Sequence, residues 1–375
     1  MSRPQTNLEK LGYFFDDEDI LRDADEDLFK FTTQEQYDAV GEAITEEVYR
    51  LLESRCGLIK TPLQLLDQPE ERPENLSFIY VSPDFDKKLT LLVLIHGSGV
   101  VRAGQWARKL IINNGLLCGT QIPYIQRALE LGYGIVVMNT NHNTSETGVP
   151  LKFSGTSSEH AINVWKTFID ESEAQFINVV AHSRGGSDIS SVLTVYGGDD
   201  RVTVLLTDSY FNFTDRVKER EKPMIAINFV AHESQNSESF EVGEFQRNRV
   251  QNLYAGTSVH EWSSHCAINA IFNLMRRQVN VENFQEVVLE SKEMVDNRQR
   301  ILEQQSSSDD PGDEEEEEQE QEEEQEEEQE EEQEEEEEDV EDEHLEHLGG
   351  EVEGGVQLED SGSSSEEPEA KRPRH

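Results

Sequence analysis

The hydrophobic positions of residues 77–280 follow two alternating patterns. Short, wholly apolar runs such as 89–95 and 202–207 are typical of strands that are covered on both faces of a sheet. Between such runs lie segments with apolar residues at helical spacing, for example 122–131 and 158–168. Strands that alternate with helices predict an α/β fold with a mostly parallel sheet flanked by helices.

The same patterns place the remaining elements of this region. We expect further strands at 78–81, 134–138, 176–181, 224–230 and 253–255, and further helices after residue 186 to about 196 and at 263–275. Thr32 and Glu35 form a possible capping box ahead of an apolar helical face over 33–55. We therefore divide the folded part into a helical, acidic N-terminal segment (1–56), an α/β domain (57–280) and one more helix (281–305).

Charge separates the last part of the chain from the rest. The 375 residues carry a formal net charge of −48, from 80 acidic and 32 basic side chains. Residues 306–375 hold 35 of those acids and three of the basic residues, a net of −32, which leaves −16 for the other residues. The glutamate-rich segment cannot bury enough apolar surface to offset its chain entropy, so we predict that 306–375 is disordered.

Composition also argues against several classes of protein. No apolar run approaches the roughly 20 residues that span a bilayer, and residues 1–30 lack the pattern of a secretory signal. Three widely spaced cysteines, Cys56, Cys118 and Cys266, favour neither a disulfide framework nor a zinc site. The strong negative charge opposes binding to a phosphate backbone. We expect no membrane, no direct nucleic acid partner, no cofactor and no metal.

One motif carries candidate chemistry. The predicted strand at 176–181 leads into His182, Ser183, Arg184 and Gly185, and then into a helix. This matches the nucleophile elbow of serine hydrolases, with Ala181 in the first small position, because the strained serine backbone needs small residues on both sides. Ser183 would be the nucleophile, and the Arg184 N–H at the helix start would be one oxyanion donor.

A glycine-rich turn supplies the second half of an oxyanion hole. Gly97, Ser98 and Gly99 follow the earlier strand at 89–95, and glycine backbone can approach an oxygen closely. The turn, one further strand–helix unit and the elbow come in the chain order of the α/β-hydrolase fold, which we predict here. The alternative is another doubly wound sheet in which His182 and Ser183 form only a tight turn.

The acid and the base of a triad should follow the serine in that order. His260 precedes the last helix of the domain and is our first choice of base, with His265 as the alternative. Asp208 ends the strand after the nucleophile helix and is our first choice of acid, with Glu233 as the alternative. An aspartate at a strand end can also be a simple cap, and a loop histidine can be purely structural.

Four segments of the chain resemble the argonaute-binding-protein-two domain family, which includes vertebrate cotranscriptional regulators: 94–99 (LIHGSG), 180–186 (VAHSRGG), 207–209 (TDS) and 255–262 (AGTSVHEW). The resemblance implies an α/β-hydrolase-like fold and a protein of nucleus and cytoplasm. It also implies argonaute and chromatin-associated partners, an influence on alternative splicing, and a hydrolase activity with Ser183 in the nucleophile position.

Two functions are compatible with these residues. The chain can be a regulatory scaffold that keeps the elbow for its geometry, since a fold does not settle function. It can instead be an active serine hydrolase that uses Ser183, His260 and Asp208. The resemblance favours the scaffold, and an acidic segment is suited to binding basic proteins.

Removal of residues 306–375 should leave the folded part intact, because a segment so poor in apolar residues contributes few core contacts. We expect the midpoint of thermal unfolding to change by less than about 2 °C, which corresponds to less than about 1 kcal/mol for a domain of this size. A decrease of many degrees in the truncated protein would contradict the assignment.

Overall fold

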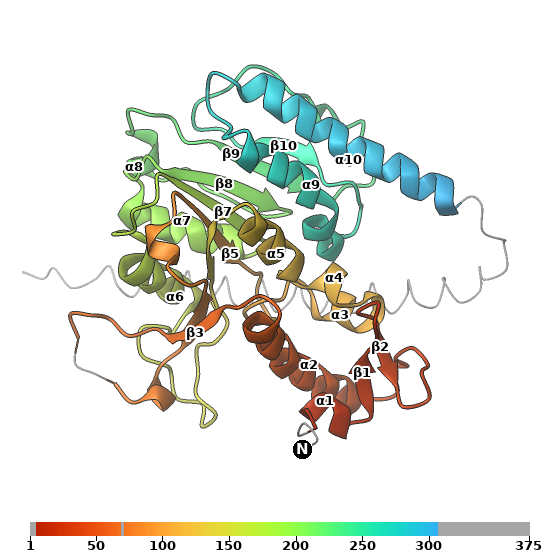
Figure 1. The fold of residues 1–375 in the computed structure, drawn as a ribbon. Helices are drawn as coiled ribbons and strands as arrows, with labels where there is room; N and C mark the ends of the chain where they lie inside the picture. Colours follow the sequence, from red (N-terminus) through yellow and green to blue (C-terminus); the bar gives the residue numbers. More distant parts are fainter. Residues whose placement is uncertain (1–4, 69–70, 307–375) are drawn as a thin grey trace, which may run out of the picture. The chain divides into compact units, whose positions relative to one another are not determined.

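The chain folds around one eight-stranded sheet, which a computed structural model describes within residues 5–68 and 71–306 (Figure 1). In spatial order the strands are β10 (Gln251–Tyr254), β9 (Ala226–Val230), β8 (Val202–Thr207), β7 (Phe176–His182), β5 (Thr90–Ile95), β6 (Gly134–Val137), β4 (Phe78–Val81) and β3 (Ile59–Pro62). Within this sheet β4 pairs antiparallel with both of its neighbours, and all other pairs are parallel. The predicted α/β fold with a mostly parallel sheet is confirmed.

The strand order has a switch point between β5 and β7. After β5 the chain adds β6 on one side, and then it crosses to β7 and continues outward through β8, β9 and β10. In open α/β sheets such a point leaves a crevice at the carboxyl ends of the strands, where ligands bind. The turn after β5 and the elbow after β7 both lie at this place.

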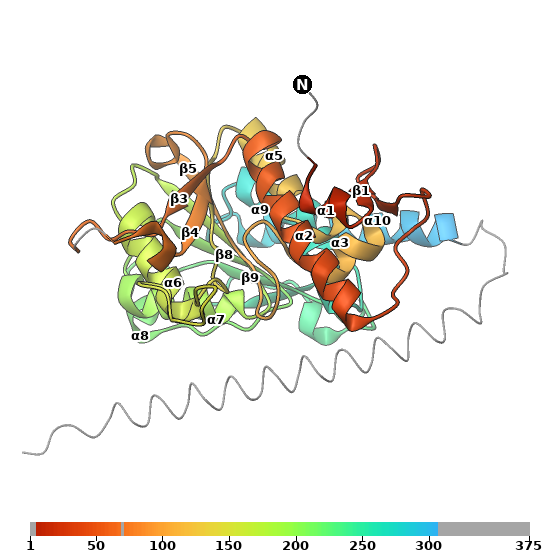
Figure 2. The same ribbon diagram turned by 90° about the horizontal axis from the view of Figure 1, so that it is seen from below.

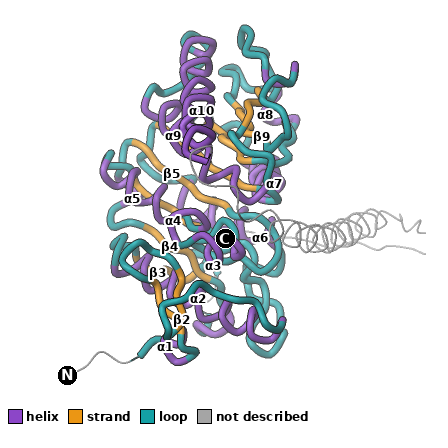
Figure 3. Tube along the Cα trace, turned by 90° about the vertical axis from the view of Figure 1, so that its right-hand side faces the viewer, coloured by secondary structure: helices purple, strands orange, loops and turns teal. Residues whose placement is uncertain are grey.

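Alternate residues of the strands enter two separate cores. Leu92, Val180 and Leu205 share one core, whereas Val93 and Val179 belong to the other. The first face is covered by α2 (Gln34–Ser54), α5 (Ile122–Glu130), α9 (Ser263–Arg276) and α10 (Phe284–Ser306), and the second by α6 (Ser157–Val164) and α7 (Gly185–Tyr196). Figure 2 shows α6 and α7 on one side of the sheet and α5 and α9 on the other. Figure 3 shows α10 lying along α9.

The N-terminal segment belongs to the same core as the sheet. It forms α1 (Asn7–Lys10), the hairpin β1 (Tyr13–Phe15) and β2 (Leu21–Asp23), and then α2. Leu8, Ile44 and Leu52 are buried in the core that contains the sheet residue Leu92. Gly104 has a φ of 90°, and a Cβ there would lie 2.8 Å from Leu52, so the loop after β5 follows the surface of α2 closely. This segment therefore packs as part of the domain.

A buried cation fastens α2 to the segment that follows β5. This segment contains helices α3 (Arg108–Asn114) and α4 (Leu116–Gly119). In another part of the fold, the short helix α8 (Asp215–Lys218) follows β8. Arg108 is 6 % exposed, and its guanidinium nitrogens lie 3.7 Å from the carboxylates of Asp38 and Glu42 on α2. Gly41 leaves room for this side chain, because a Cβ at that position would lie 2.8 Å from it.

Most predicted elements match the structure within a few residues, and the differences have local causes. The N-cap of α2 is Thr33, whose hydroxyl accepts from the Gln36 N–H, so the predicted capping box of Thr32 and Glu35 is wrong. The edge strand β3 and the three-residue strands β1 and β2 were not predicted, because they have no long apolar run. Among the described residues, no helix is long and apolar enough to cross a bilayer. The prediction of disorder falls almost entirely outside the described residues, which end with α10 at Ser306.

Candidate active site

Ser183 occupies a strained turn between β7 and α7. Its φ is +49°, in the left-handed region that a residue with a side chain rarely adopts. Small neighbours make this turn possible: a Cβ on Gly185 would lie 2.9 Å from the carbonyl oxygens of Ile95 and His96, and one on Gly186 would lie 2.1 Å from the Tyr210 carbonyl oxygen. The backbone therefore has the geometry of a nucleophile elbow.

The turn after β5 lies directly against this serine. A Cβ on Gly97 would lie 2.9 Å from Ser183 Cβ and 3.3 Å from Ser183 Oγ, so only glycine allows the approach. Asn141 holds the turn from the far side, since its Nδ2 donates to the carbonyl oxygens of Gly97 and Gly99 at 2.9 and 3.0 Å. In a planar trans peptide the next N–H points opposite to the carbonyl, so the Ser98 N–H faces away from Asn141.

Asp208 and His260 form a hydrogen-bonded pair at the same edge of the sheet. Asp208 follows β8 with a φ of +45°, and His260 begins the short 3₁₀ helix His260–Trp262 after β10. His260 Nδ1 donates to Asp208 Oδ2 at 2.8 Å, and the Ala231 N–H donates to Asp208 Oδ1 at 3.1 Å. A carboxylate only accepts, so the bond fixes the hydrogen of neutral His260 on Nδ1 and leaves a lone pair on Nε2.

His182 connects this pair to the elbow. The rings of His182 and His260 lie 4.6 Å apart between centroids, with an angle of 33° between their planes. His182 Nδ1 donates to the Thr207 carbonyl oxygen at 2.9 Å. Burial holds the pKa of His182 well below its usual range, and repulsion from His260 acts in the same direction. The neutral ring of His182 therefore packs against the candidate base His260 and immediately precedes Ser183 in the chain.

The serine hydroxyl itself lies beside Gly97. The ring of His260 packs against the ring of His182, the residue that precedes Ser183 in the elbow. Catalytic hydrogen bonds are often long in the absence of substrate, and a serine side chain changes rotamer easily. Ser209 Oγ donates to the Ser183 carbonyl oxygen at 2.5 Å, which fixes the backbone but leaves the side chain to rotate.

The two alternative candidates, Glu233 and His265, lie in other surroundings. Glu233 lies exposed in the loop after β9. His265 lies on α9, where its Nδ1 contacts the Leu117 carbonyl oxygen at 3.2 Å. Among the four candidates, the hydrogen bond between His260 Nδ1 and Asp208 Oδ2 joins the two first choices. Arg184 is the residue before α7, as expected for a donor at the helix start.

Sequence reasoning missed several residues that shape the site. Asn141, Ser209 and His182 act through backbone carbonyls or ring packing, and such contacts leave no pattern in a single sequence. Only the position of His182 beside the serine gave a hint. Within the described residues, no three His, Cys, Asp or Glu side chains are grouped in a way that would hold a metal ion.

Comparison with known proteins defines the family. Residues 4–157 match the model of the Arb2 domain. A FAM172 family protein homolog from Caenorhabditis elegans is 53 % identical over 293 residues, which cover 77 % of this chain and 93 % of that protein. This chain belongs to the Arb2-domain, FAM172 family. The domain match includes the turn at 97–99 but ends before Ser183, Asp208 and His260, so it carries no information about the candidate triad.

Other members of the family have a name that refers to transcription. The cotranscriptional regulator ARB2A homolog of Gallus gallus is 34 % identical over 348 residues, covering 74 % of this chain and 81 % of that protein. Its Dictyostelium discoideum counterpart is 27 % identical, covering 72 % and 79 %. The similarity extends through most of the described domain in both cases.

Solved structures show only a distant likeness. A histone deacetylase from Saccharomyces cerevisiae matches with a TM-score of 0.38 and 15 % identity, covering 68 % of this chain and 98 % of that chain. Naproxen esterase from Bacillus subtilis matches with a TM-score of 0.27 and 14 % identity, covering 49 % and 53 %. The assignment of an α/β-hydrolase fold therefore rests on the strand order and the elbow of this chain.

Buried histidines near the site should make stability depend on pH. Burial lowers the pKa of His96 to about 4 and the pKa of His160 to about 3. In the unfolded chain both histidines bind a proton near pH 6.5. The stability that comes from keeping them neutral in the folded chain is therefore complete above that pH and is lost as the pH falls towards 4. As the pH falls from roughly 6 to 5, each imidazole should lower the free energy of unfolding by about 1.4 kcal/mol per pH unit.

The variant His96→Asn isolates this effect. Denaturant unfolding at pH 7.5, 6 and 5 should give a free energy of unfolding that falls less steeply for the variant, by about 1.4 kcal/mol per pH unit. The asparagine amide can still donate to the Gly97 carbonyl oxygen, which His96 Nδ1 contacts at 2.8 Å in the native chain. Parallel pH profiles for the two proteins would show that His96 does not titrate as described.

Proposed function

We propose that this chain is a cotranscriptional regulator built on an α/β-hydrolase fold, with chromatin-associated proteins and an argonaute protein among its partners. The names and identities of its relatives support the regulatory role. The family resemblance in the motif segments supports the argonaute partner, an influence on alternative splicing, and a location in nucleus and cytoplasm.

We also propose that the site at the switch point can carry out serine hydrolysis. The observation that carries this proposal is the 2.8 Å bond between Asp208 and His260, next to a serine held at a φ of +49°. A tight turn alone does not require an oriented acid–base pair beside it. Fold alone would not support the proposal.

The chemistry follows from the positions of these groups. Ser183 Oγ rotates from Gly97 towards His260 Nε2 and attacks an acyl carbonyl, while Nε2 takes the hydroxyl proton. The Asp208 carboxylate stabilises the imidazolium that forms. The N–H groups of Ser98 and Arg184 stabilise the oxyanion. Collapse of the intermediate transfers the proton from His260 to the leaving group, and water then hydrolyses the acyl-enzyme with the same base.

A fluorophosphonate probe tests whether the site is active, since it forms an adduct that resembles the tetrahedral intermediate. The wild-type protein should be labelled, and Ser183→Ala should abolish labelling. His260→Ala should slow labelling at least about a hundredfold, because a general base contributes about that much or more. The matched controls His265→Ala and Glu233→Ala should label at the wild-type rate. Mass spectrometry of the adduct identifies the labelled residue.

The same variants separate catalysis from scaffolding. Partner capture should survive Ser183→Ala, because loss of one hydroxyl removes little binding surface. A folded wild-type protein that is never labelled would refute the hydrolase and leave the regulator. If Ser183→Ala remains folded but loses its partners, the elbow is itself a binding surface and the division of roles proposed above is wrong.

The acidic segment 306–375 should bind basic partners in a salt-dependent manner. Its net charge of −32 attracts cations over a distance that salt shortens to a Debye length of about 8 Å at physiological ionic strength. The full-length chain should capture a histone-tail peptide at 50 mM salt at least about tenfold better than the chain truncated at 305, and the advantage should vanish near 500 mM. Equal capture by both chains at low salt would contradict this role.

A further inference from the structure

Three carbonyl oxygens of the turn after β5 point to the same side. Asn141, in the loop after β6, donates from Nδ2 at 2.9, 3.0 and 3.2 Å to the carbonyl oxygens of Gly97, Gly99 and Val101. These residues alternate along the chain, so one side chain orients the whole turn. In a planar trans peptide the N–H points opposite to the carbonyl, and the Ser98 N–H therefore lies on the other side of the turn.

Arg102 contacts the same carbonyl oxygens as Asn141. Its Nη1 donates to the carbonyl oxygen of Val101 at 2.9 Å and to that of Gly99 at 3.2 Å. Its backbone N–H donates to Gln105 Oε1 at 3.3 Å, which anchors the residue from the main chain as well. A guanidinium does not lose its proton in a protein. A permanent positive charge therefore lies on the carbonyl side of the turn.

The charge of Arg102 lies in a part of the chain that holds few acids. Residues 87–158 carry seven basic and two acidic side chains, a net of +5, whereas the whole chain carries −48. The charge also acts inside the domain: burial is the main cause of the lowered pKa of His96, and repulsion from Arg102 lowers that pKa further. His96 Nδ1 donates to the Gly97 carbonyl oxygen at 2.8 Å. The field of Arg102 thus extends to the first peptide of the turn.

We propose that Arg102 and Asn141 polarise the turn from its carbonyl side and are positioning residues for the oxyanion hole. Donors on a carbonyl oxygen polarise the peptide, and the N–H at its other end becomes a stronger donor. The Ser98 N–H then meets the oxyanion formed at Ser183 with a larger positive partial charge and in a fixed direction. This role rests on the serine hydrolysis proposed above, and both side chains act through the backbone.

Fluorophosphonate labelling tests the role when the rate at saturating probe is measured separately from the apparent affinity for the probe. Asn141→Asp keeps the shape of the side chain, removes both N–H donors and places an anion against the carbonyl oxygens. It should lower the saturating rate at least about a hundredfold, the value of one oxyanion donor, and leave the affinity within about twofold. Arg102→Gln keeps a donor without the charge and should lower the rate about tenfold, whereas Arg102→Lys should retain most of it.

Amide NMR of the full-length chain follows the turn without any reaction. Glycine labelled with ¹³C at the carbonyl, combined with serine and valine labelled with ¹⁵N, selects the Gly–Ser and Gly–Val peptides, of which this sequence has six. The peptides 97–98 and 99–100 belong to the turn, and substitution of their serine and valine assigns the two signals. Asn141→Asp should shift both signals. Arg102→Gln should shift mainly the 99–100 signal, because Arg102 contacts that carbonyl oxygen.

Asn143 provides a matched control in the same loop as Asn141. Its Nδ2 also donates to two carbonyl oxygens, those of Thr140 and Ser154 at 2.8 and 3.0 Å, but neither belongs to the turn. Asn143→Asp makes the same chemical change and removes a similar number of hydrogen bonds. It should label within about twofold of the wild-type rate and leave both amide signals of the turn in place.

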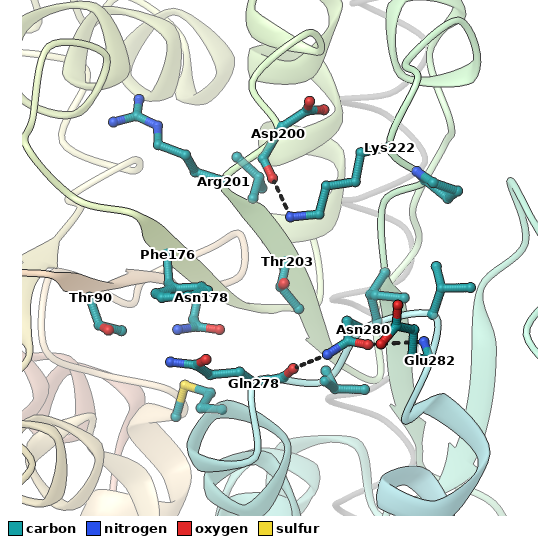
Figure 4. Close-up of a pocket in the computed structure, with 16 residues that line it drawn as sticks. Thr90, Phe176, Asn178, Asp200, Arg201, Thr203, Lys222, Gln278, Asn280 and Glu282 are labelled. Carbon is teal, nitrogen blue, oxygen red and sulfur yellow. Dashed lines mark hydrogen bonds between the residues drawn. The ribbon is translucent and has the colours of Figure 1, made fainter.

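Asn178 provides a second control on the strand that carries the elbow. It is 7 % exposed and lies near the start of β7, whereas Ser183 follows the end of that strand. Figure 4 shows Asn178 beside Thr90 and Thr203 at a cavity of about 440 Å³, lined by the first residues of β5, β7 and β8. Asn178→Asp should destabilise the sheet but label within about twofold of the wild-type rate.

The outcomes separate this role from the hydrolysis on which it rests. A folded wild-type chain that is never labelled would overturn both. A labelled wild type with an equal saturating rate in Asn141→Asp and Arg102→Gln would overturn the positioning role alone. The same conclusion would follow if the rates fell while both amide signals stayed in place, since the side chains would then not act through the turn. Because Arg102 is partly exposed, Arg102→Gln decides the matter if Asn141→Asp does not fold.

Discussion

The close approach of two backbone turns at the centre of the sheet is the constraint on which the rest of the structure depends. The turn after β5 and the elbow after β7 come so near that a methyl group at Gly97 or Gly185 would collide with Ser183 or with the end of β5. This contact requires β5 and β7 to be neighbours, which fixes the switch point of the sheet. It also requires a positive φ at Ser183, a conformation that costs about 1–3 kcal/mol and that the surrounding pairs of strands must maintain.

Histidines surround this contact in two different environments. His96 and His160 are fully buried and kept neutral, and they organise backbone groups near the turn. His260 is 40 % exposed and bonded to a carboxylate, so it alone among these three combines access to solvent with an oriented base. The contrast between buried, neutral rings and one oriented ring is the physical difference between structural and candidate catalytic histidines in this protein.

The fold class and the chain order of the candidate site residues could be predicted from the sequence, but the contacts that support the site could not. Apolar runs predicted seven of the eight strands of the sheet, because a strand covered on both faces must be apolar throughout. The edge strand β3 (Ile59–Pro62) is mostly exposed and therefore has no such signature. Asp208 and His260 could be ranked by their places at a strand end and before the last helix of the domain. Asn141 could not be found in this way, because its role depends on which backbone the fold brings to it.

The switch point also divides the chain into two halves that need each other. Residues up to β6 supply β3, β4, β5 and β6, and the residues from β7 onward supply the other four strands. Every residue of β5 is buried, and one side of that strand is hydrogen-bonded to β7 along its whole length. A shortened product that ended near residue 157, where the domain match ends, would leave β5 as an apolar edge strand of six residues. Such edges recruit further strands from other molecules, so the first half alone would aggregate instead of acting as a smaller version of the protein.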